Sequence, residues 1–409
     1  MATSLLAILT QILSALEKKL MTPAARINAA IDLIDRIQSG ELVDRALASW
    51  GRNNRYAGSK DRASIGDIVY DVLRKKQIYS ALGSGQTGRA LLLGFVRASG
   101  QDPETIFGID RYAPPKLSED ERIFGKSDGP ATDEITDFPD WVWPELVKSY
   151  GDKAAAIARA LGNRAPIYLR VNLAKSSRED AIKSLASEGI TGETNPLSPS
   201  AVQVLDGARK IRNSTSFLTG RVELQDASSQ AVSDLVPLQT GQTLLDFCAG
   251  AGGKVLAVAG RVSGDFYAHD VEPRRMKDLA SRAARAGVSV KQVSIEGLNP
   301  GTQFDTVLVD APCSGSGSWR RDPQGKWLLT PEKLDQVTQL QEKILNQVST
   351  LVGPKGHLVY ATCSLFEREN ELQMEKFLGH NNAFSLLSEH HFTPLEGGDG
   401  FYCAVLYKN

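Results

Sequence analysis

The feature that most constrains the fold is a regular alternation of short apolar runs and helical segments from about residue 225 to the C-terminus. Apolar runs separated by helices favour a parallel sheet, because each parallel strand needs a long crossover to return to the same edge. We therefore predict an α/β fold here, with a doubly wound, mostly parallel sheet of the Rossmann-like kind. A chain of 409 residues also exceeds the size of one hydrophobic core, so we expect further domains upstream.

The first hundred residues are predicted to be all-helical. Thr22 is a typical N-cap with Pro23 at the first helical position, and apolar residues then recur at helical spacing up to residue 37. A second amphipathic helix is expected over residues 62–76. Residues 22–100 contain 12 Lys or Arg against 7 Asp or Glu, so this region is locally basic although the whole chain has a net charge of −1.

The charge reverses after residue 100, where residues 101–140 contain 4 Lys or Arg against 11 Asp or Glu. This stretch also contains Pro114-Pro115 and Gly129-Pro130, which indicate a connecting segment. We expect a small α/β module to follow, with a strand at Ile167–Val171 and a helix at Arg178–Glu188. The predicted domains are a helical domain with an acidic linker (1–140), a small α/β module (141–224) and the α/β domain with the parallel sheet (225–409).

Residues 1–20 contain an apolar run without the features of a signal peptide. No positive charge precedes the run, and Glu17, Lys18 and Lys19 follow it where small residues should stand. We predict an amphipathic helix, or an extension upstream of an alternative start at Met21. The four cysteines are too few for a disulfide framework and form no Cys-x-x-Cys pair, which predicts reduced thiols, a cytoplasmic location and no metal site.

A glycine-rich turn follows the first strand of the alternating region. After Thr243–Phe247 comes Cys248-Ala249-Gly250-Ala251-Gly252-Gly253-Lys254, and a helix is expected from about Val255. Glycines let the backbone approach a ligand, although such a turn alone is often structural. The next strand ends at Asp270, at the usual distance for a carboxylate that binds ribose hydroxyls. The turn predicts a nucleoside cofactor and leaves a dinucleotide dehydrogenase open, whereas Val255 stands where a phosphate loop needs Ser or Thr.

Two later strands each lead into a cysteine motif. Phe304–Val309 is followed by Asp310-Ala311-Pro312-Cys313-Ser314-Gly315, and the strand at 356–360 is followed by Ala361-Thr362-Cys363-Ser364. Ligand sites of open α/β sheets lie at the carboxyl ends of the strands. We therefore expect two thiols and a carboxylate to lie together.

These two motifs, with Arg320-Arg321-Asp322-Pro323 and Lys326-Trp327 between them, resemble the NOP/Sun (RsmB-like) family of RNA cytosine-5 methyltransferases. The resemblance covers most of residues 220–409. It implies S-adenosylmethionine as cofactor and methylation of carbon 5 of a cytosine in RNA. By the same resemblance, 225–409 is a class I methyltransferase domain, and the helical domain and the small α/β module bind RNA. The stretch Arg55–Arg62 further resembles the helical extension of bacterial members that act on 16S ribosomal RNA.

The resemblance also implies roles for individual residues. Carbon 5 of cytosine is a poor nucleophile until a group adds to carbon 6, and a thiolate suits that addition. Cys363 corresponds to the attacking residue, Cys313 to the group that assists release after methyl transfer, and Asp310 to a contact with the base edge. We expect Lys254, if it points into the pocket, to favour the thiolate.

The sequence departs from the family pattern at the cofactor site. Ala251 and Val255 replace a proline and a threonine, which the loop can tolerate because its backbone forms the contacts. Ser294 stands where the family has an aspartate that contacts adenine, so adenine binding is weaker or Glu296 substitutes. The cofactor-binding residues implied are Cys248, Ala249, Gly250, Ala251, Gly252, Gly253, Lys254, Asp270, Ser294 and Asp310.

Other residues near the motifs have simpler interpretations. Cys248 and Cys403 are expected to be small buried residues, Asp246 to be structural or to support the site from behind, and His269 to pack within its strand. The Arg320-Arg321 pair suits contacts with RNA phosphates, or belongs to a solvated loop.

Two functional alternatives stay open. The catalytic motifs do not exclude the same chemistry on transfer RNA. A catalytically silent RNA-binding or ribosome assembly factor is a second alternative, against which the filled thiol and aspartate positions argue. We also predict that basic residues of the helical domain bind RNA backbone, with a solvated basic face as the alternative; they include Arg52, Arg55, Lys60 and Arg62.

Overall fold

The computed structural model describes residues 21–124 and 136–409, so the expectation for residues 1–20 lies outside the described residues. The chain divides into two compact units, Met1–Pro139 and Asp140–Asn409. This division falls one residue before the predicted boundary, and the predicted module and catalytic domain share the second unit. Among the described helices, none is long and apolar enough to cross a membrane.

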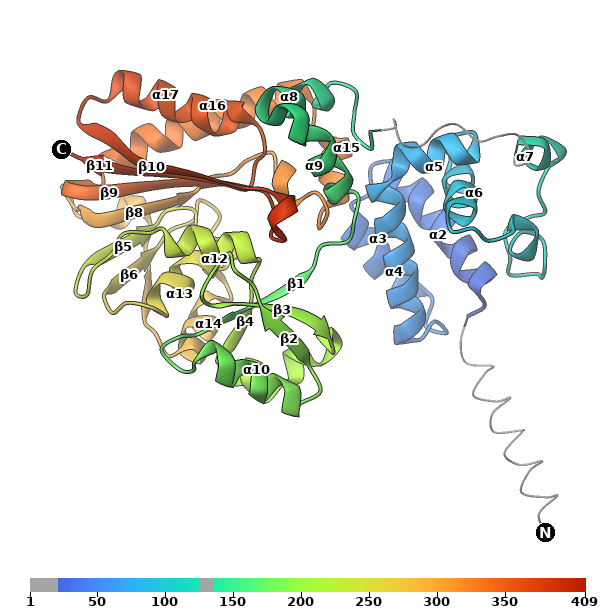
Figure 1. Cartoon of the computed structure of the whole chain (residues 1–409), viewed down its shortest axis with the longest axis horizontal. Coiled ribbons are helices and arrows are strands. Elements are labelled where there is room, and N and C mark those ends of the chain that lie inside the picture. The colour runs from blue at the N-terminus through green and yellow to red at the C-terminus, as the bar shows by residue number, and fades with distance from the viewer. Residues whose placement is uncertain (1–20, 125–135) are drawn as a thin grey trace, which may run out of the picture. The chain divides into compact units, whose positions relative to one another are not determined.

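Helices form the described part of the first unit up to Gly100, as the sequence predicts (Figure 1). The Thr22 side chain accepts a hydrogen bond from the Ala25 backbone N–H, and Pro23 begins the first helix. The apolar faces of the helices meet in one core, in which Leu33 and Leu92 are fully buried. The helices are α2 (Pro23–Gln38), α3 (Val43–Asn53), α4 (Ser59–Arg74), α5 (Lys76–Gly83) and α6 (Gly88–Ala98).

Part of the acidic stretch packs on this helical core, which corrects its interpretation as a plain connecting segment. Phe107 and Leu117 are buried in the core. Glu121 in α7 (Glu119–Phe124) forms a bidentate ion pair with Arg89 of α6, with N–O distances of 2.8 and 2.9 Å. The apolar positions between the acidic residues provide the burial that a linker lacks. Gly129-Pro130 lies outside the described residues.

The second unit begins with α8 (Val142–Tyr150) and α9 (Ala154–Leu161), and the small module follows. Its strands form an antiparallel sheet in the order β2-β3-β1-β4, and the apolar residues of β1 pack on α10. The module contains β1 (Ile167–Val171), α10 (Arg178–Ser187), β2 (Thr191–Thr194), β3 (Ala201–Asp206), α11 (Thr215–Leu218) and β4 (Val222–Leu224).

The remainder of this unit is built on a larger sheet with the strand order β10-β11-β9-β8-β5-β6-β7 (Figure 1). The pairs from β9 to β7 are parallel, and only the pairs that involve β11 are antiparallel. The strands are β5 (Thr243–Asp246), β6 (Asp265–Ala268), β7 (Val290–Gln292), β8 (Phe304–Asp310), β9 (Val352–Thr362), β10 (Phe384–Phe392) and β11 (Phe401–Lys408).

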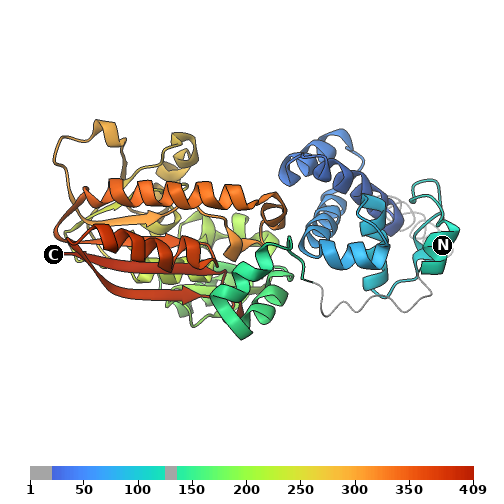
Figure 2. The same ribbon diagram turned by 90° about the horizontal axis from the view of Figure 1, so that it is seen from above.

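Helices cover both faces of this sheet, so the predicted doubly wound α/β fold is confirmed. One core contains Leu244 and Leu308 with residues of α12, α13 and α14, whereas the other contains Leu245 and Val307 with residues of α16 and α17. Figure 2 shows α16 running along the sheet beside α17. The helices are α12 (Ala227–Asp234), α13 (Gly253–Ala259), α14 (Leu279–Ala286), α15 (Pro323–Leu328), α16 (Pro331–Ser349) and α17 (Glu371–His380).

Candidate active site

A cavity of about 940 Å³ lies at the carboxyl ends of the parallel strands. From β5 the chain continues to β6 and β7 on one side of the sheet and then to β8 and β9 on the other side. The cavity therefore lies where the strand order reverses its direction. The predicted site residues that line it are Cys248, Asp270, Ser294, Asp310, Cys313 and Cys363.

The rest of the predicted glycine loop lies behind the cavity wall. Gly250 and Gly252 have φ angles of +52° and +79°, which disfavour other residue types. The Gly250 N–H donates to the Asp270 carboxylate at 2.9 Å, and the Ala249 N–H donates to the His269 carbonyl at 2.9 Å. Ala251 and Gly253 are likewise absent from the lining. The loop therefore holds the wall of the cavity in place and contributes Cys248 to its surface.

Asp270 is almost completely buried, with 2% of its surface exposed, yet it borders the cavity. One carboxylate oxygen accepts from Gly250 and forms an ion pair with Arg275 Nη1 at 3.1 Å. The other accepts from the Glu272 N–H at 2.9 Å. These partners fix the orientation of the carboxylate, and its remaining lone pairs can accept ligand hydroxyls.

The β7 side of the cavity contains Ser294, the position expected to depart from the family pattern. Ser294 and Glu296 both line the cavity, but the Ser294 hydroxyl accepts from the Gly297 N–H at 3.1 Å and so caps a turn. Sequence reasoning missed Val271, which lines the cavity and is 91% exposed. An apolar residue directly after Asp270 was the available signal. His269 packs on Phe247 with 4.9 Å between ring centroids, as expected, and both rings also line the cavity.

The two motif cysteines lie side by side, with 3.3 Å between Cys313 Sγ and Cys363 Sγ. Both are free thiols and both line the cavity. The hydrogen bond to Cys363 raises the pKa of Cys313 well above its ordinary value, and burial raises it further. Cys313 is therefore the partner that keeps its proton.

A buried cation lies beside the thiols. Lys254 points toward the site, and its Nζ donates to Asp310 Oδ2 at 2.6 Å. Burial alone would lower the pKa of Lys254, but the charge and hydrogen bond of Asp310, together with Cys363, raise it above its ordinary value. Lys254 therefore stays protonated, and a neighbouring ammonium group favours a thiolate.

Of the other residues near the motifs, Asp246 and Cys403 do not line the cavity, whereas Cys248 does. Asp246 is buried behind the cavity, where burial and the charge of Asp310 raise its pKa to about 7. Cys403 is fully buried, as expected, whereas Cys248 is only partly buried because it lines the cavity. All four cysteines of the chain lie in the described residues and are free thiols.

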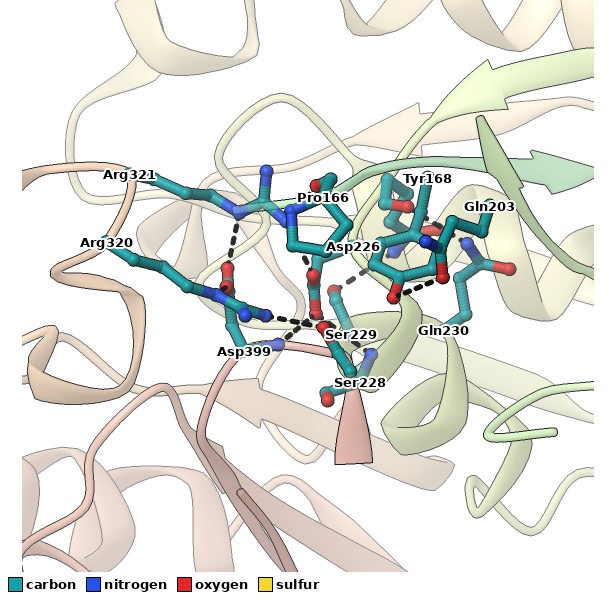
Figure 3. A network of polar contacts seen from close by, with 12 residues as sticks. Pro166, Tyr168, Gln203, Asp226, Ser228, Ser229, Gln230, Arg320, Arg321 and Asp399 are labelled. Carbon is teal, nitrogen blue, oxygen red and sulfur yellow. Dashed lines mark hydrogen bonds and ion pairs between the residues drawn. The ribbon is translucent and has the colours of Figure 1, made fainter. Parts of the chain in front are cut away.

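Arg320 and Arg321, expected to contact phosphates or to lie in a solvated loop, are held in ion pairs, and Arg320 is buried. Figure 3 shows both guanidinium groups directed at Asp399. Arg320 has 5% of its side chain exposed and donates to Asp399 at 2.7 Å, while Arg321 donates to Asp399 at 2.5 Å and to Asp226 at 2.7 Å. Arg321 also donates to the Pro166 carbonyl at 3.1 Å. The pair is held in ion pairs because acidic groups distant in sequence meet it in the fold.

Comparisons with known proteins identify relatives of this chain. The family model of the 16S rRNA methyltransferase RsmB/F matches residues 234–406, and that of the RsmF/B-like ferredoxin-like domain matches residues 138–212. Ribosomal RNA small subunit methyltransferase B of Enterobacter sp. (strain 638) is 34% identical over 286 residues, and its Vibrio vulnificus (strain YJ016) counterpart is 33% identical over 283. Each match spans 66% of this chain and 66% of the relative.

Solved structures share the fold. The crystal structure of PH0851 has a TM-score of 0.73 and 23% identity, and covers 95% of this chain and 100% of its own. A methyltransferase homologue from Pyrococcus horikoshii has a TM-score of 0.60 and 26% identity, covering 66% of this chain and 96% of its own. NSun6 from the same organism, solved with SFG, has a TM-score of 0.59 and 19% identity over 66% of this chain and 98% of its own.

Proposed function

The chain belongs to the RsmB/F family of RNA methyltransferases within the NOP/Sun group, and from this premise we propose that it methylates carbon 5 of a cytosine in 16S ribosomal RNA. The cofactor of the family is S-adenosylmethionine. RNA as the partner and a cytoplasmic location belong to the same proposal. The observation that carries it is the 3.3 Å approach of Cys313 and Cys363 beside the Lys254–Asp310 pair.

The cavity suits S-adenosylmethionine in size and in its polar groups. A volume of about 940 Å³ is within the range of pockets for ligands of this size. Asp270 offers carboxylate oxygens for ribose hydroxyls, and exposed Val271 offers an apolar surface next to them. When bound, S-adenosylmethionine supplies an electrophilic methyl group.

Cys363 performs the first step in this proposal. Its thiolate adds to carbon 6 of the cytosine, and the electron pair of the 5,6 double bond becomes available at carbon 5, which accepts the methyl group. Asp310, which lines the same cavity, contacts the edge of the base. The target base must leave its stack to reach the thiol, so an unstacked cytosine is the preferred substrate.

Cys313 acts in the second step. After methyl transfer, carbon 5 carries a hydrogen that must leave as a proton before the bond between carbon 6 and Cys363 breaks and returns its electrons to sulfur. The largest cause that raises the pKa of Cys313 is its hydrogen bond to Cys363. That cause weakens while Cys363 is bonded to the base, so Cys313 can release its own proton to solvent, and the resulting thiolate takes the proton from carbon 5.

Methyl transfer to defined RNAs tests the function. The purified protein and Cys363→Ala would be given methyl-labelled S-adenosylmethionine with unmodified 16S ribosomal RNA, the small-subunit particle or transfer RNA, and bisulfite sequencing would locate the product. We expect label at one cytosine of 16S ribosomal RNA with the native protein and none with the variant. Label in transfer RNA alone would replace the substrate, and absence of both label and cofactor binding would favour the silent factor.

A further inference from the structure

A buried carboxyl group connects the two loops that carry the thiols. Glu369 ends the 3-10 turn Glu367–Glu369, two residues before α17, and is fully buried. Its Oε1 accepts from the Ser314 N–H at 2.7 Å. Its Oε2 accepts from the Ser314 hydroxyl at 2.5 Å and from the Ser364 hydroxyl. Because Ser314 follows Cys313 and Ser364 follows Cys363, one carboxylate holds the neighbours of both thiols.

Neutral donors complete the surroundings of this carboxylate. Gln341 of α16, itself fully buried, donates from Nε2 to Glu369 Oε1 at 3.1 Å and to the Pro312 carbonyl at 2.9 Å. Burial raises the pKa of Glu369, and the hydrogen bonds from Ser314, Ser364 and Gln341 oppose that rise. The hydrogen bonds of this buried network restrict its members to one arrangement, although the Gln341 Oε1 has no hydrogen-bond partner in it.

The residue after Glu369 holds the second loop from its other side. Asn370 Oδ1 accepts from the Thr362 hydroxyl at 2.6 Å, and its Nδ2 donates to the Ser364 carbonyl at 3.1 Å. The Ser316 hydroxyl, from the first loop, lies 3.1 Å from the Ser364 hydroxyl. Cys313 and Cys363 both lie beyond the ends of their strands, so the two cysteine loops are joined by these side chains and by a backbone bond from the Gly317 N–H to the Cys363 carbonyl at 2.9 Å.

We propose that Glu369 is a positioning residue that fixes the separation of the Cys313 and Cys363 thiols. The inference rests on the proposed function, which requires both thiols at the same cytosine. Loss of the carboxylate removes its hydrogen bonds with Ser314 and Ser364, so Cys313 can shift relative to Cys363 although Gly317 still bonds to the Cys363 carbonyl. A displacement of about 1 Å at a reacting group can reduce the rate on the order of a hundredfold.

Two readouts test this role in the full-length protein with Glu369→Ala, Glu369→Gln and Ser364→Ala. The first is steady-state methylation of 16S ribosomal RNA, with kcat and KM determined separately. The second is retention of a trivalent phenylarsenical, which releases water when it bonds to two neighbouring thiols. Its loss to a competing monothiol would be followed by intact mass. Cys313→Ala shows whether retention requires both thiols.

Asp305→Asn is the matched control. Asp305 lies at the opposite end of β8 and accepts from the Thr243 N–H and hydroxyl, each at 2.8 Å, so its loss weakens the same sheet away from the thiols. We expect Glu369→Ala to lower kcat tenfold to a hundredfold with KM changed less than threefold, and to release the arsenical at least tenfold faster. Glu369→Gln, which keeps one acceptor oxygen, should change both kcat and the rate of arsenical release less than Glu369→Ala does. Asp305→Asn should retain both wild-type values.

Three outcomes overturn the positioning role. The first is that Glu369→Gln and Ser364→Ala both keep wild-type kcat and arsenical retention. The second is that Asp305→Asn loses as much kcat and retention as the Glu369 variants. The third is that the Glu369 variants differ from the native protein in KM alone. If Glu369→Ala does not fold, the two milder variants carry the same comparison. A native protein that retains the arsenical but methylates no RNA contradicts the proposed function, and arsenical retention in the variants still decides the position of the thiols.

Discussion

Asp270 is the single residue on which we expect cofactor affinity to depend most. Its carboxylate is oriented by Gly250 and Arg275 and borders the cavity, so it can accept charge-assisted hydrogen bonds from ribose hydroxyls. Such bonds contribute about 1.5 to 3 kcal/mol each. Asp270→Ala should therefore raise the Kd of S-adenosylmethionine at least tenfold in titration calorimetry, because alanine can neither accept the hydroxyls nor hold Gly250.

Asp265, at the start of β6 and therefore at the other end of the strand that precedes Asp270, provides the control for this measurement. Asp265 has 61% of its side chain exposed and pairs with Lys291, so Asp265→Ala should leave the Kd unchanged. A folded Asp270→Ala protein with wild-type affinity would remove Asp270 from the cofactor site.

Local sequence predicts a residue's role only when the partners that decide the role are also local. The sequence could place Asp310, Cys313 and Cys363 together because all three stand at or shortly after the ends of two strands that recognisable motifs mark. Glu369 could not, since its partner Ser314 is 55 positions away. The ion pairs of Arg320 and Arg321 could not be predicted for the same reason, because Asp399 is distant in sequence.

At the scale of elements, burial on both faces of the sheet explains why the central strands could be predicted. The run at Phe304–Val309 is apolar at every position except Asp305 and Thr306, and it forms most of β8. Regular alternation fails at the end of the chain, where β10 and β11 pair antiparallel and only residues 393–400, with a single 3-10 turn, connect them. Antiparallel neighbours need no helical crossover, so the pattern there contains no helix to find.

At the scale of the whole molecule, the basic residues of the helical unit are expected to set the salt dependence of RNA binding. Arg52 and Arg55 are exposed near the end of α3, where they can reach phosphates. Each phosphate that a protein neutralises adds roughly 0.7 to 0.9 to the slope of log affinity against log salt concentration, so the double variant Arg52→Ala/Arg55→Ala should reduce this slope by about 1.4 to 1.8. Filter binding to 16S ribosomal RNA over a range of salt concentrations measures the slope.

An equal loss of charge elsewhere separates a specific surface from a general charge effect. Lys343 and Lys355 are exposed on the second unit, so Lys343→Ala/Lys355→Ala should change the slope by less than half as much. Equal slopes for the two double variants would mean that Arg52 and Arg55 belong to a solvated face without a role in RNA binding.

The central claim, that Cys363 attacks the base and Cys313 assists release, is tested most directly by denaturing gel electrophoresis of each cysteine variant after reaction with 16S ribosomal RNA and labelled cofactor. Cys363→Ala should form neither product nor adduct, because no thiolate adds to carbon 6. Cys313→Ala should attack and methylate but fail to release, so a covalent protein–RNA complex that carries the labelled methyl group should accumulate. Trapping by Cys363→Ala but not by Cys313→Ala would contradict the account and make Cys313 the nucleophile.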